Sequence, residues 1–255
     1  MKLYQICFSP TGGTQKVADA VCSAWSCERE TIDLCSPSFS GEGYQFERED
    51  VCVVAVPSFG GRVPVTAVER LSKLQGNGAS AILVAVYGNR AYEDTLLELS
   101  DCLEKAGFRC RAAIAALAEH SIVRKIAAGR PDQQDLTQLK AFSNEIHDGF
   151  EHLPEKVHVP GNRPYRAWGG SALKPKASAA CTGCGTCAAR CPVGAIPVQQ
   201  PDQVDAERCI ACMRCLSVCP VHARVLDETM LQGLTQKLES VCTGRKENEL
   251  FKTAE

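Results

Sequence analysis

Hydrophobic and polar positions in the first 150 residues alternate between strand-like and helix-like patterns. Uninterrupted runs of six apolar residues occur at 51–56 and 81–86. Runs of this length are typical of strands that are buried on both faces of a parallel sheet. Residues 3–8 and 111–117 are weaker examples, and residues 31–34 alternate polar with apolar, as an edge strand does. The pattern therefore predicts five strands.

Apolar residues at helical spacing lie between or after these strands, in four stretches at 17–25, 65–71, 92–103 and 136–150. Strands that alternate with helices predict a doubly wound α/β domain with a parallel sheet over residues 1–158. The alternating strand fits the edge position in the strand order 2-1-3-4-5.

A change of pattern follows this domain. Residues 159–177 are rich in proline and glycine and have no clear period, which predicts a linker or an ordered wrap. A second, small α+β domain is predicted over residues 178–228. The last segment, 229–255, combines a short helix at about 227–240 with a polar, frayed tail from residue 243.

Charge is nearly balanced over the whole chain, with a formal net charge of -2. This balance argues against a dedicated nucleic-acid binder, which would carry a basic excess. Residues 159–201 nevertheless hold five basic side chains and no Asp or Glu. This stretch either offsets nearby negative charge or binds an acidic partner, and the sequence leaves both readings open.

The chain shows no sign of a membrane span or of a secretory leader. No apolar run approaches the ~18 residues of a spanning helix, and the first residues are too short and too mixed for a signal peptide. A cytoplasmic location is therefore expected.

Cysteine is the outlier in the composition, with 16 of 255 residues. Half of these cysteines fall within residues 181–219. A cytosolic chain does not normally keep disulfides, so the dense half predicts a metal site. The other eight have no ligand spacing, and those on apolar faces are expected to be small core residues; they are Cys7, Cys22, Cys27, Cys35, Cys52, Cys102, Cys110 and Cys242.

The dense half is an internal repeat. Two runs of the form C-x₂-C-x₂-C-x₃-C-P begin at Cys181 and at Cys209, offset by 28 residues. Three thiolates on one tight turn can reach three irons of a cubane, and the fourth cysteine of each run ligates the other cluster. The spacing thus predicts two 4Fe-4S clusters. One is held by Cys181, Cys184, Cys187 and Cys219, and the other by Cys209, Cys212, Cys215 and Cys191.

A zinc module is the alternative for these cysteines. Zinc prefers two separated pairs of ligands, and four cysteines per run closed by a proline do not have that form. Gly183 and Gly185 leave backbone N–H groups free to approach the sulfurs. Over residues 178–225 the doubled motif resembles the bacterial-type two-cluster ferredoxins.

Three loops at the carboxyl ends of the predicted strands are candidates for a ligand site. The first strand ends in small hydroxyl residues and glycines that offer donors to a phosphate. Two further loops combine glycines with an aromatic residue. The candidate residues are Ser9, Pro10, Thr11, Gly12, Gly13, Thr14, Pro57, Ser58, Phe59, Gly60, Gly61, Tyr87, Gly88, Asn89, Arg90 and Tyr92.

Together these three loops resemble the flavodoxin family. The resemblance implies a flavodoxin-like fold and FMN, with the phosphate on residues 9–14 and the isoalloxazine between residues 57–62 and 87–92. A purely structural role for the loops is the alternative. His120 follows the fifth strand and is a candidate proton donor near the flavin, with a hydrogen-bonded structural role as its alternative.

The whole chain resembles proteins of anaerobic microbes in which a flavodoxin-like domain is fused to a two-cluster ferredoxin. A flavin takes electrons singly or in pairs, whereas a cubane passes one at a time. The first hypothesis is an electron-transfer protein whose redox partner is a ferredoxin, a dehydrogenase or a reductase.

Two other functions stay open. One is an FMN-dependent reductase of a small organic molecule, with His120 as its acid. The other is a cluster-stabilised interaction module with a vestigial flavin site. The sequence does not decide whether the chain is an enzyme or an electron carrier.

Overall fold

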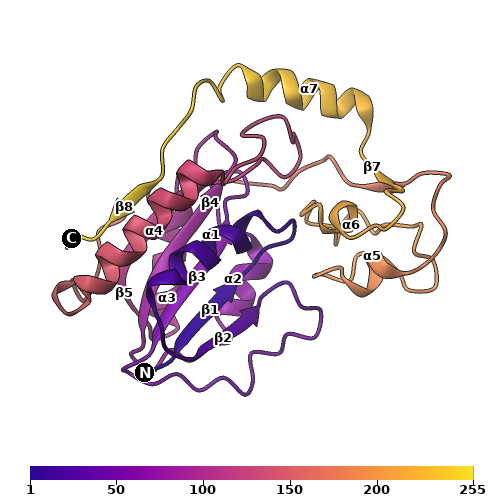
Figure 1. Cartoon of the computed structure of the whole chain (residues 1–255). Coiled ribbons are helices and arrows are strands. Elements are labelled where there is room, and N and C mark those ends of the chain that lie inside the picture. The colour runs from indigo at the N-terminus through magenta and orange to yellow at the C-terminus, as the bar shows by residue number, and fades with distance from the viewer. Residues whose placement is uncertain (255) are drawn as a thin grey trace.

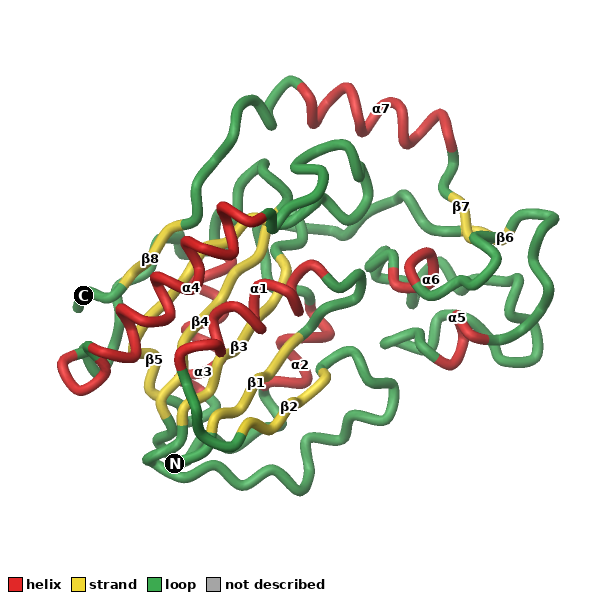
Figure 2. The backbone as a smooth tube through the Cα atoms, in the orientation of Figure 1, coloured by secondary structure: helices red, strands yellow, loops and turns green. Residues whose placement is uncertain are grey.

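The computed structural model describes residues 1–254 and places one six-stranded sheet at its centre (Figures 1 and 2). The strand order is β2-β1-β3-β4-β5-β8, with the first five parallel and the last antiparallel. The strands are β1 (Leu3–Cys7), β2 (Arg29–Asp33), β3 (Val51–Pro57), β4 (Ser80–Tyr87), β5 (Arg109–Leu117) and β8 (Glu249–Phe251). The predicted order 2-1-3-4-5 is confirmed, and it is the flavodoxin-like order.

Helices cover both faces of this sheet (Figure 1). Val17 and Leu139 belong to one apolar cluster under α1 and α4, and Leu71 and Leu96 belong to a second cluster under α2 and α3. Burial of β3 and β4 from both sides explains their continuous apolar runs. The helical elements of this domain are α1 (Gly13–Val21), η1 (Cys22–Ala24), α2 (Val65–Leu71), α3 (Thr95–Lys105), α4 (Gln133–Asp148) and η2 (Phe150–His152).

A small cysteine-rich unit lies beside the carboxyl ends of the strands (Figure 1). After it, the last helix crosses back toward the sheet, and Leu238 packs against Val123 and Ile126 of the loop after β5. The helix predicted near 227–240 is confirmed. The elements of this part are β6 (Lys176–Ala177), α5 (Thr186–Ala189), α6 (Arg214–Ser217), β7 (Arg224–Val225) and α7 (Glu228–Glu239).

The predicted frayed tail is wrong for its central part. Residues 249–251 form β8, which pairs with β5 through Ala113↔Phe251 and Ala115↔Glu249. Asn248 is buried, and its Oδ1 accepts a hydrogen bond from the Leu117 N–H at 2.9 Å. Three residues carry too little periodicity to signal a strand. The open edge of β5, which is distant in the chain, provides the pairing.

Residues 159–175 are an ordered wrap along α3. The carboxylate of Asp94 accepts hydrogen bonds from the backbone N–H groups of Asn162 at 2.8 Å and Arg166 at 2.7 Å. Arg163 pairs with Asp101, and Arg166 pairs with Glu93. Part of the basic stretch is therefore neutralised within the chain.

Most of the cysteines outside the repeat lie in the core, as their apolar positions predict. Cys7, Cys22 and Cys52 are buried, whereas Cys102 is partly buried. Burial raises the pKa of the Cys22 thiol to about 12 and that of Cys102 to about 11. These thiols are protonated at neutral pH and act as small apolar side chains.

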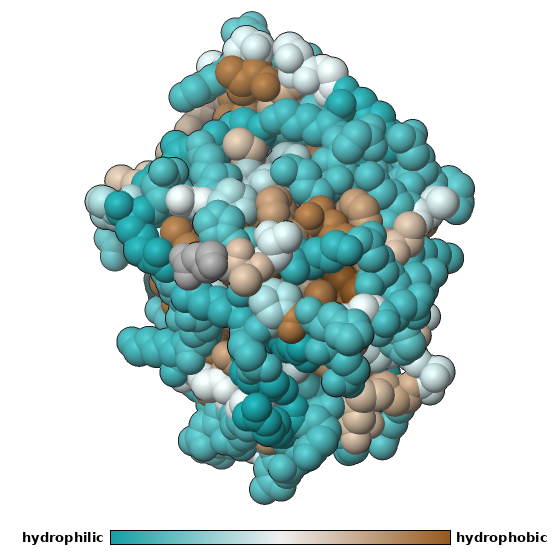
Figure 3. Space-filling view, turned by 90° about the vertical axis from the view of Figure 1, so that its left-hand side faces the viewer, coloured by the Kyte–Doolittle hydropathy of each residue, from teal (hydrophilic) through white to brown (hydrophobic). Residues whose placement is uncertain are grey.

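The outer surface is mixed in character. The face that carries the C-terminal end is mostly hydrophilic and interrupted by small apolar patches (Figure 3). Among the helices of residues 1–254, none combines the length and apolar character that a membrane crossing requires.

Candidate functional site

Four cysteines of the repeat surround a first cavity in the cysteine-rich unit. Cys181, Cys184, Cys187 and Cys219 all line it, and its free volume is about 310 Å³. We call it the cluster I cavity. Cys184 is exposed, whereas Cys187 is buried. This cavity therefore lies close to the molecular surface.

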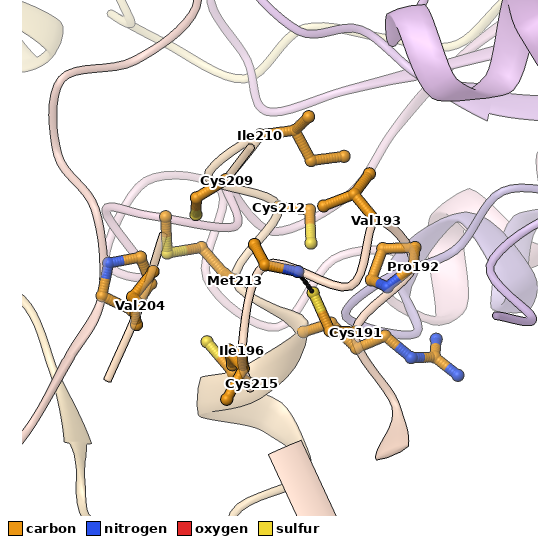
Figure 4. A pocket seen from close by; sticks show the side chains of 13 residues that line it. Cys191, Pro192, Val193, Ile196, Val204, Cys209, Ile210, Cys212, Met213 and Cys215 are labelled. Atoms are coloured by element: carbon orange, nitrogen blue, oxygen red, sulfur yellow. Dashed lines mark hydrogen bonds between the residues drawn. The ribbon is translucent and has the colours of Figure 1, made fainter. Parts of the chain in front are cut away.

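The other four cysteines of the repeat surround a second cavity. Cys191, Cys209, Cys212 and Cys215 line a free volume of about 360 Å³, which we call the cluster II cavity. Their sulfurs point into the space that the four side chains enclose (Figure 4). The fourth cysteine of each run thus lies with the first three of the other run.

The two cavities are related by the 28-residue repeat. The chain turns through positive φ at Gly183 (70°) and Gly185 (73°), and again at the equivalent Ala211 (52°) and Met213 (63°). Non-glycine residues in this region cost conformational energy, so the tight turn is imposed by the fold of the loop. Both runs consequently curve around a cavity in the same way.

Backbone N–H groups point at two sulfurs in equivalent positions. The Ala195 N–H donates to Cys191 Sγ at 3.3 Å, and the Ala223 N–H donates to Cys219 Sγ at 3.2 Å. Such bonds stabilise thiolate charge on a cluster ligand.

The pKa values of the cysteine thiols are shifted in opposite directions in the two cavities. Burial raises the pKa of Cys212 to about 11 and of Cys215 to about 12. For Cys184, hydrogen bonds from the side chain and backbone of Thr186 lower the pKa instead. Thiolate ligands must lose their protons when a metal binds, so metal binding at the cluster II cavity would deprotonate Cys212 and Cys215.

A third, larger cavity lies between the flavodoxin-like domain and the cysteine-rich unit, and we call it the interdomain cavity. Its free volume is about 990 Å³, part of it open to solvent. Five sequence-predicted residues line it: Ser58, Phe59, Gly60, Arg90 and His120. Residues 9–14, Pro57, Gly61, Tyr87, Gly88, Asn89 and Tyr92 are not among its lining residues.

The remaining predicted loop residues serve contacts within the protein. Tyr87 and Tyr92 pack edge to face, with ring centroids 5.2 Å apart, and Tyr92 Oη donates to Glu249 at 3.2 Å. Asn89 Nδ2 donates to the carbonyls of Cys242 and Gly244, at 3.1 and 3.0 Å. These contacts join the loop to the C-terminal segment.

Residues 9–14 form a turn at the start of α1. Ser9 Oγ accepts from the Gln15 N–H at 2.9 Å, and Gly12 has a φ of 91°. A Cβ on Gly13 would stand 3.2 Å from Ala118 Cβ, so the loop passes close to the end of β5. Arg214, from the second cysteine run, donates to the Ser9 carbonyl at 3.3 Å.

The imidazole of His120 is held in one tautomer. Its Nδ1 accepts from the N–H groups of Ile122 at 3.2 Å and Val123 at 3.0 Å, so Nε2 carries the proton. Burial and the nearby Arg90 charge lower the pKa of His120 to about 4. At neutral pH the ring is an uncharged hydrogen-bond donor beside the interdomain cavity.

Sequence reasoning missed several residues of this cavity. Trp168 lies against Gly60, where an added Cβ would come within 2.3 Å of its indole. Ile210 and Ala211 reach the cavity from the loop between Cys209 and Cys212. Trp168 stands in a segment without periodicity, and Ile210 is an ordinary apolar residue between two ligands. The sequence around Trp168 or Ile210 therefore gave no indication that either residue lines a cavity.

Two arginines, the buried Arg70 and the partly buried Arg214, join the two domains. Arg70 of α2 donates to the carbonyl of Pro192 at 2.6 Å and also contacts the carbonyl of Leu34. Arg214 lies 3.8 Å from the carboxylate of Asp33. Both contacts connect the strand ends with the cysteine-rich unit.

Comparison with known proteins agrees with this division. Residues 180–223 match the family model of the 4Fe-4S dicluster domain. Over 75 residues the chain is 37% identical to one component of the ion-translocating oxidoreductase complex of Methanosarcina acetivorans. That match covers 29% of this chain and 27% of the relative, so the chain spans about a quarter of that protein's length.

Solved structures similar to the chain include flavodoxins. An archaeal flavodoxin is 13% identical, with a TM-score of 0.41, and the match covers 60% of this chain and all of that one. A Streptococcus pneumonia flavodoxin is 18% identical, with a TM-score of 0.37, covering 58% and 97%. A Bacillus anthracis azoreductase is 10% identical, with a TM-score of 0.42, covering 57% and 99%.

The strand order and the matched cluster motif define the class of protein. The chain joins a flavodoxin-like α/β domain to a 4Fe-4S dicluster domain. This combination fits a flavodoxin/ferredoxin fusion.

Proposed function

We propose that this protein passes electrons through a row of three redox centres: a cluster in the cluster I cavity, a cluster in the cluster II cavity, and FMN at the interdomain cavity. The observation that carries the proposal is the position of Ile210, which lines both the cluster II cavity and the interdomain cavity. One side chain therefore lies between a predicted cluster and the predicted flavin.

The cysteine cavities fit two cubanes of the type 4Fe-4S. In each, four cysteines from both halves of the repeat surround one cavity. Among residues 1–254, no group of three or more His, Cys, Asp or Glu side chains is arranged to hold a single metal ion. A zinc ion would draw its sulfurs to about 2.3 Å from one point. The open arrangement favours a cluster over zinc.

The chemistry of the interdomain cavity fits a flavin. Phe59 and Trp168 provide aromatic surface, and Lys237 provides positive charge. Arg90 and Arg166 add charge that Glu93 partly offsets. FMN bound here would supply a centre that accepts one or two electrons.

Residues 9–14 are the proposed phosphate site. They precede α1, whose N-terminal N–H groups favour an anion. Gly12, at the N-cap of α1, has no side chain to satisfy those groups, and within residues 1–254 Ser9 Oγ accepts only from the Gln15 N–H. The flavin ring would then extend from this loop toward residues 58–60.

The order of the centres follows from burial. Cys184 is exposed at the cluster I cavity, whereas Cys212 is buried at the cluster II cavity. A redox protein partner, such as a ferredoxin, a dehydrogenase or a reductase, would therefore exchange electrons at cluster I. Cluster II would connect it to the flavin.

Cofactor content is the first test. After anaerobic purification and reconstitution, we expect about eight irons and eight sulfides per chain, in two cubanes, and one FMN. Zinc in place of iron, or about four irons, would contradict the two-cluster proposal. A chain that contains iron but does not bind FMN would instead favour the interaction module.

Tryptophan fluorescence tests where the flavin binds, because the chain has two tryptophans and Trp168 lines the cavity. In Trp25→Phe, added FMN should quench the remaining Trp168 strongly. In Trp168→Phe, the remaining Trp25, which is buried in the core beneath α1, should be quenched much less. Equal quenching in both variants would contradict binding at this cavity.

The rate of electron transfer from the reduced protein partner to FMN tests the proposed order of the three centres. Cys212→Ala should remove cluster II, leave FMN bound, and abolish the reduction of FMN by the reduced protein partner. Cys102→Ala, which changes a partly buried cysteine outside the repeat, is the matched control. FMN reduction at an unchanged rate in Cys212→Ala would overturn the proposed route.

A substrate reductase is the second candidate, favoured by the opening of the interdomain cavity to solvent and by the neutral His120 beside it. The Nε2–H of His120 can orient a substrate oxygen by a hydrogen bond. Turnover of a quinone or nitroaromatic probe that falls at least tenfold in His120→Phe, with FMN content unchanged, would support this function. Equal turnover in both proteins would leave electron transfer as the role.

A further inference from the structure

The 28-residue repeat makes the two cluster cavities nearly equivalent, and one pair of positions breaks the symmetry. Ile196 lines the cluster II cavity, and Arg224, which occupies the equivalent place, lines the cluster I cavity. Both side chains are 5% exposed. One cavity thus has an apolar wall where the other has a guanidinium.

Arg224 contacts a predicted ligand directly. Its Nη2 donates to Cys187 Sγ at 3.2 Å and also contacts the carbonyl of Pro201. Its Nη1 is buried and has no hydrogen-bond partner in the described part of the chain. Among residues 1–254, no carboxylate forms an ion pair with it. A buried guanidinium stays protonated and is strongly unfavourable without compensating negative charge.

We propose that Arg224 raises the reduction potential of the cluster in the cluster I cavity above that of the cluster in the cluster II cavity. The first electron then reduces cluster I in preference to cluster II. Four thiolates around a cubane supply the negative charge that the guanidinium lacks. Each reduction adds one electron to the cluster, breaks no bond, and leaves the proton on Arg224 in both oxidation states. A fixed positive charge stabilises the reduced form more than the oxidised form.

The cations near the cluster II cavity are placed differently. Arg214 directs its guanidinium to Asp33 and to the Ser9 carbonyl, so a carboxylate offsets its charge. Lys174 contacts the Cys209 carbonyl. Neither forms a hydrogen bond to a cysteine sulfur. The greater exposure of Cys184 acts in the same direction as Arg224, because solvent also favours the more charged reduced cluster.

The inference rests on the proposed clusters, and the experiment distinguishes a failure of the cluster proposal from a failure of the Arg224 proposal. Anaerobic potentiometric titration with dithionite and mediators, followed by EPR, would measure the midpoint potential of each cluster in the reconstituted protein. Cys184→Ser assigns the signal of cluster I. Iron and sulfide analysis shows first whether each variant holds both clusters. A wild-type protein without clusters would contradict the proposed function and not the role of Arg224.

Three substitutions at this position separate the effect of charge from that of side-chain shape. Arg224→Ile copies the other half of the repeat, and Arg224→Gln keeps a hydrogen-bond donor without charge. In both, the reduced-to-oxidised ratio of cluster I at a fixed potential should fall about tenfold, or about 59 mV for one electron. Arg224→Lys should keep most of the wild-type value. Arg190→Gln, which removes an exposed cation from the first cysteine run, is the matched control.

Two results would overturn the inference. One is an unchanged cluster I potential in both uncharged variants with both clusters intact. The other is an equal shift of both clusters: the Arg224 charge also reaches Cys215 of the cluster II cavity, so the inference requires the larger shift at cluster I. If Arg224→Ile does not assemble its clusters, Arg224→Gln and Arg224→Lys still compare the neutral and the charged side chain.

Discussion

Arg70 Nη2 lies 2.6 Å from the carbonyl oxygen of Pro192, the residue that follows the predicted ligand Cys191. This hydrogen bond joins α2 of the flavodoxin-like domain to the wall of the cluster II cavity. The guanidinium is buried, also contacts the Leu34 carbonyl after β2, and lies over the Phe39 ring, 5.7 Å from its centroid. Arg70 therefore helps to fix the position of the cluster II cavity against the sheet domain, together with Arg214.

Arg70→Met should loosen this docking. Two buried carbonyls lose their donor, which costs about 1–3 kcal/mol. We expect a lower urea midpoint and faster hydrogen exchange at residues 192–196. Glu69→Gln, an exposed change on the same helix, is the control. Unchanged exchange at residues 192–196 would contradict the role of Arg70.

Cys191→Ala should damage the cluster held mainly by Cys209, Cys212 and Cys215. The reason is that Cys191 lines their cavity, although it belongs to the other cysteine run. EPR and iron analysis should show the loss of about half of the iron, with the cluster I signal retained. Cys27→Ala is the control outside the repeat. Loss of the cluster I signal alone would refute the crossed arrangement.

Asp135→Ala should destabilise the protein by about 3–5 kcal/mol, because it leaves the buried Arg130 without its carboxylate. Arg130 Nε donates to Asp135 Oδ2 at 2.8 Å, and Asn248 Nδ2 donates to Oδ1 at 3.3 Å. Chemical denaturation would measure the change, with hydrogen exchange at β8 as a local probe. Asp148→Ala, an exposed change at the end of the same helix, should cost less than about 0.5 kcal/mol.

Stability should fall in acid because of His120. The folded pKa of about 4 lies below the unfolded value of 6.5. The contribution of the neutral ring is therefore complete above about pH 6.5 and is lost as the pH falls toward 4. Between pH 8 and 5 this amounts to about 1–2 kcal/mol. Urea midpoints should show a smaller drop over this range in His120→Phe; an identical drop would contradict the assignment.

Local sequence predicted the elements that depend on local physics. Residues 51–56 and 81–86 are strands because continuous apolar runs require burial on both faces. The wrap at 159–175 and the strand at 249–251 depend on partners far away in the chain, such as Asp94 and the edge of β5. Their own residues carried no period to indicate these partners.

The sequence by itself determined the cysteine spacing and the repeat, since the ligands of each run are only a few residues apart and the chemistry of a cubane fixes their number. Only the tertiary structure placed Ile210 between two cavities, Trp168 against Gly60, and Arg224 beside Cys187. These relationships join residues separated by tens to more than a hundred positions. They arise when whole elements pack together, and no local pattern encodes which side chains then meet.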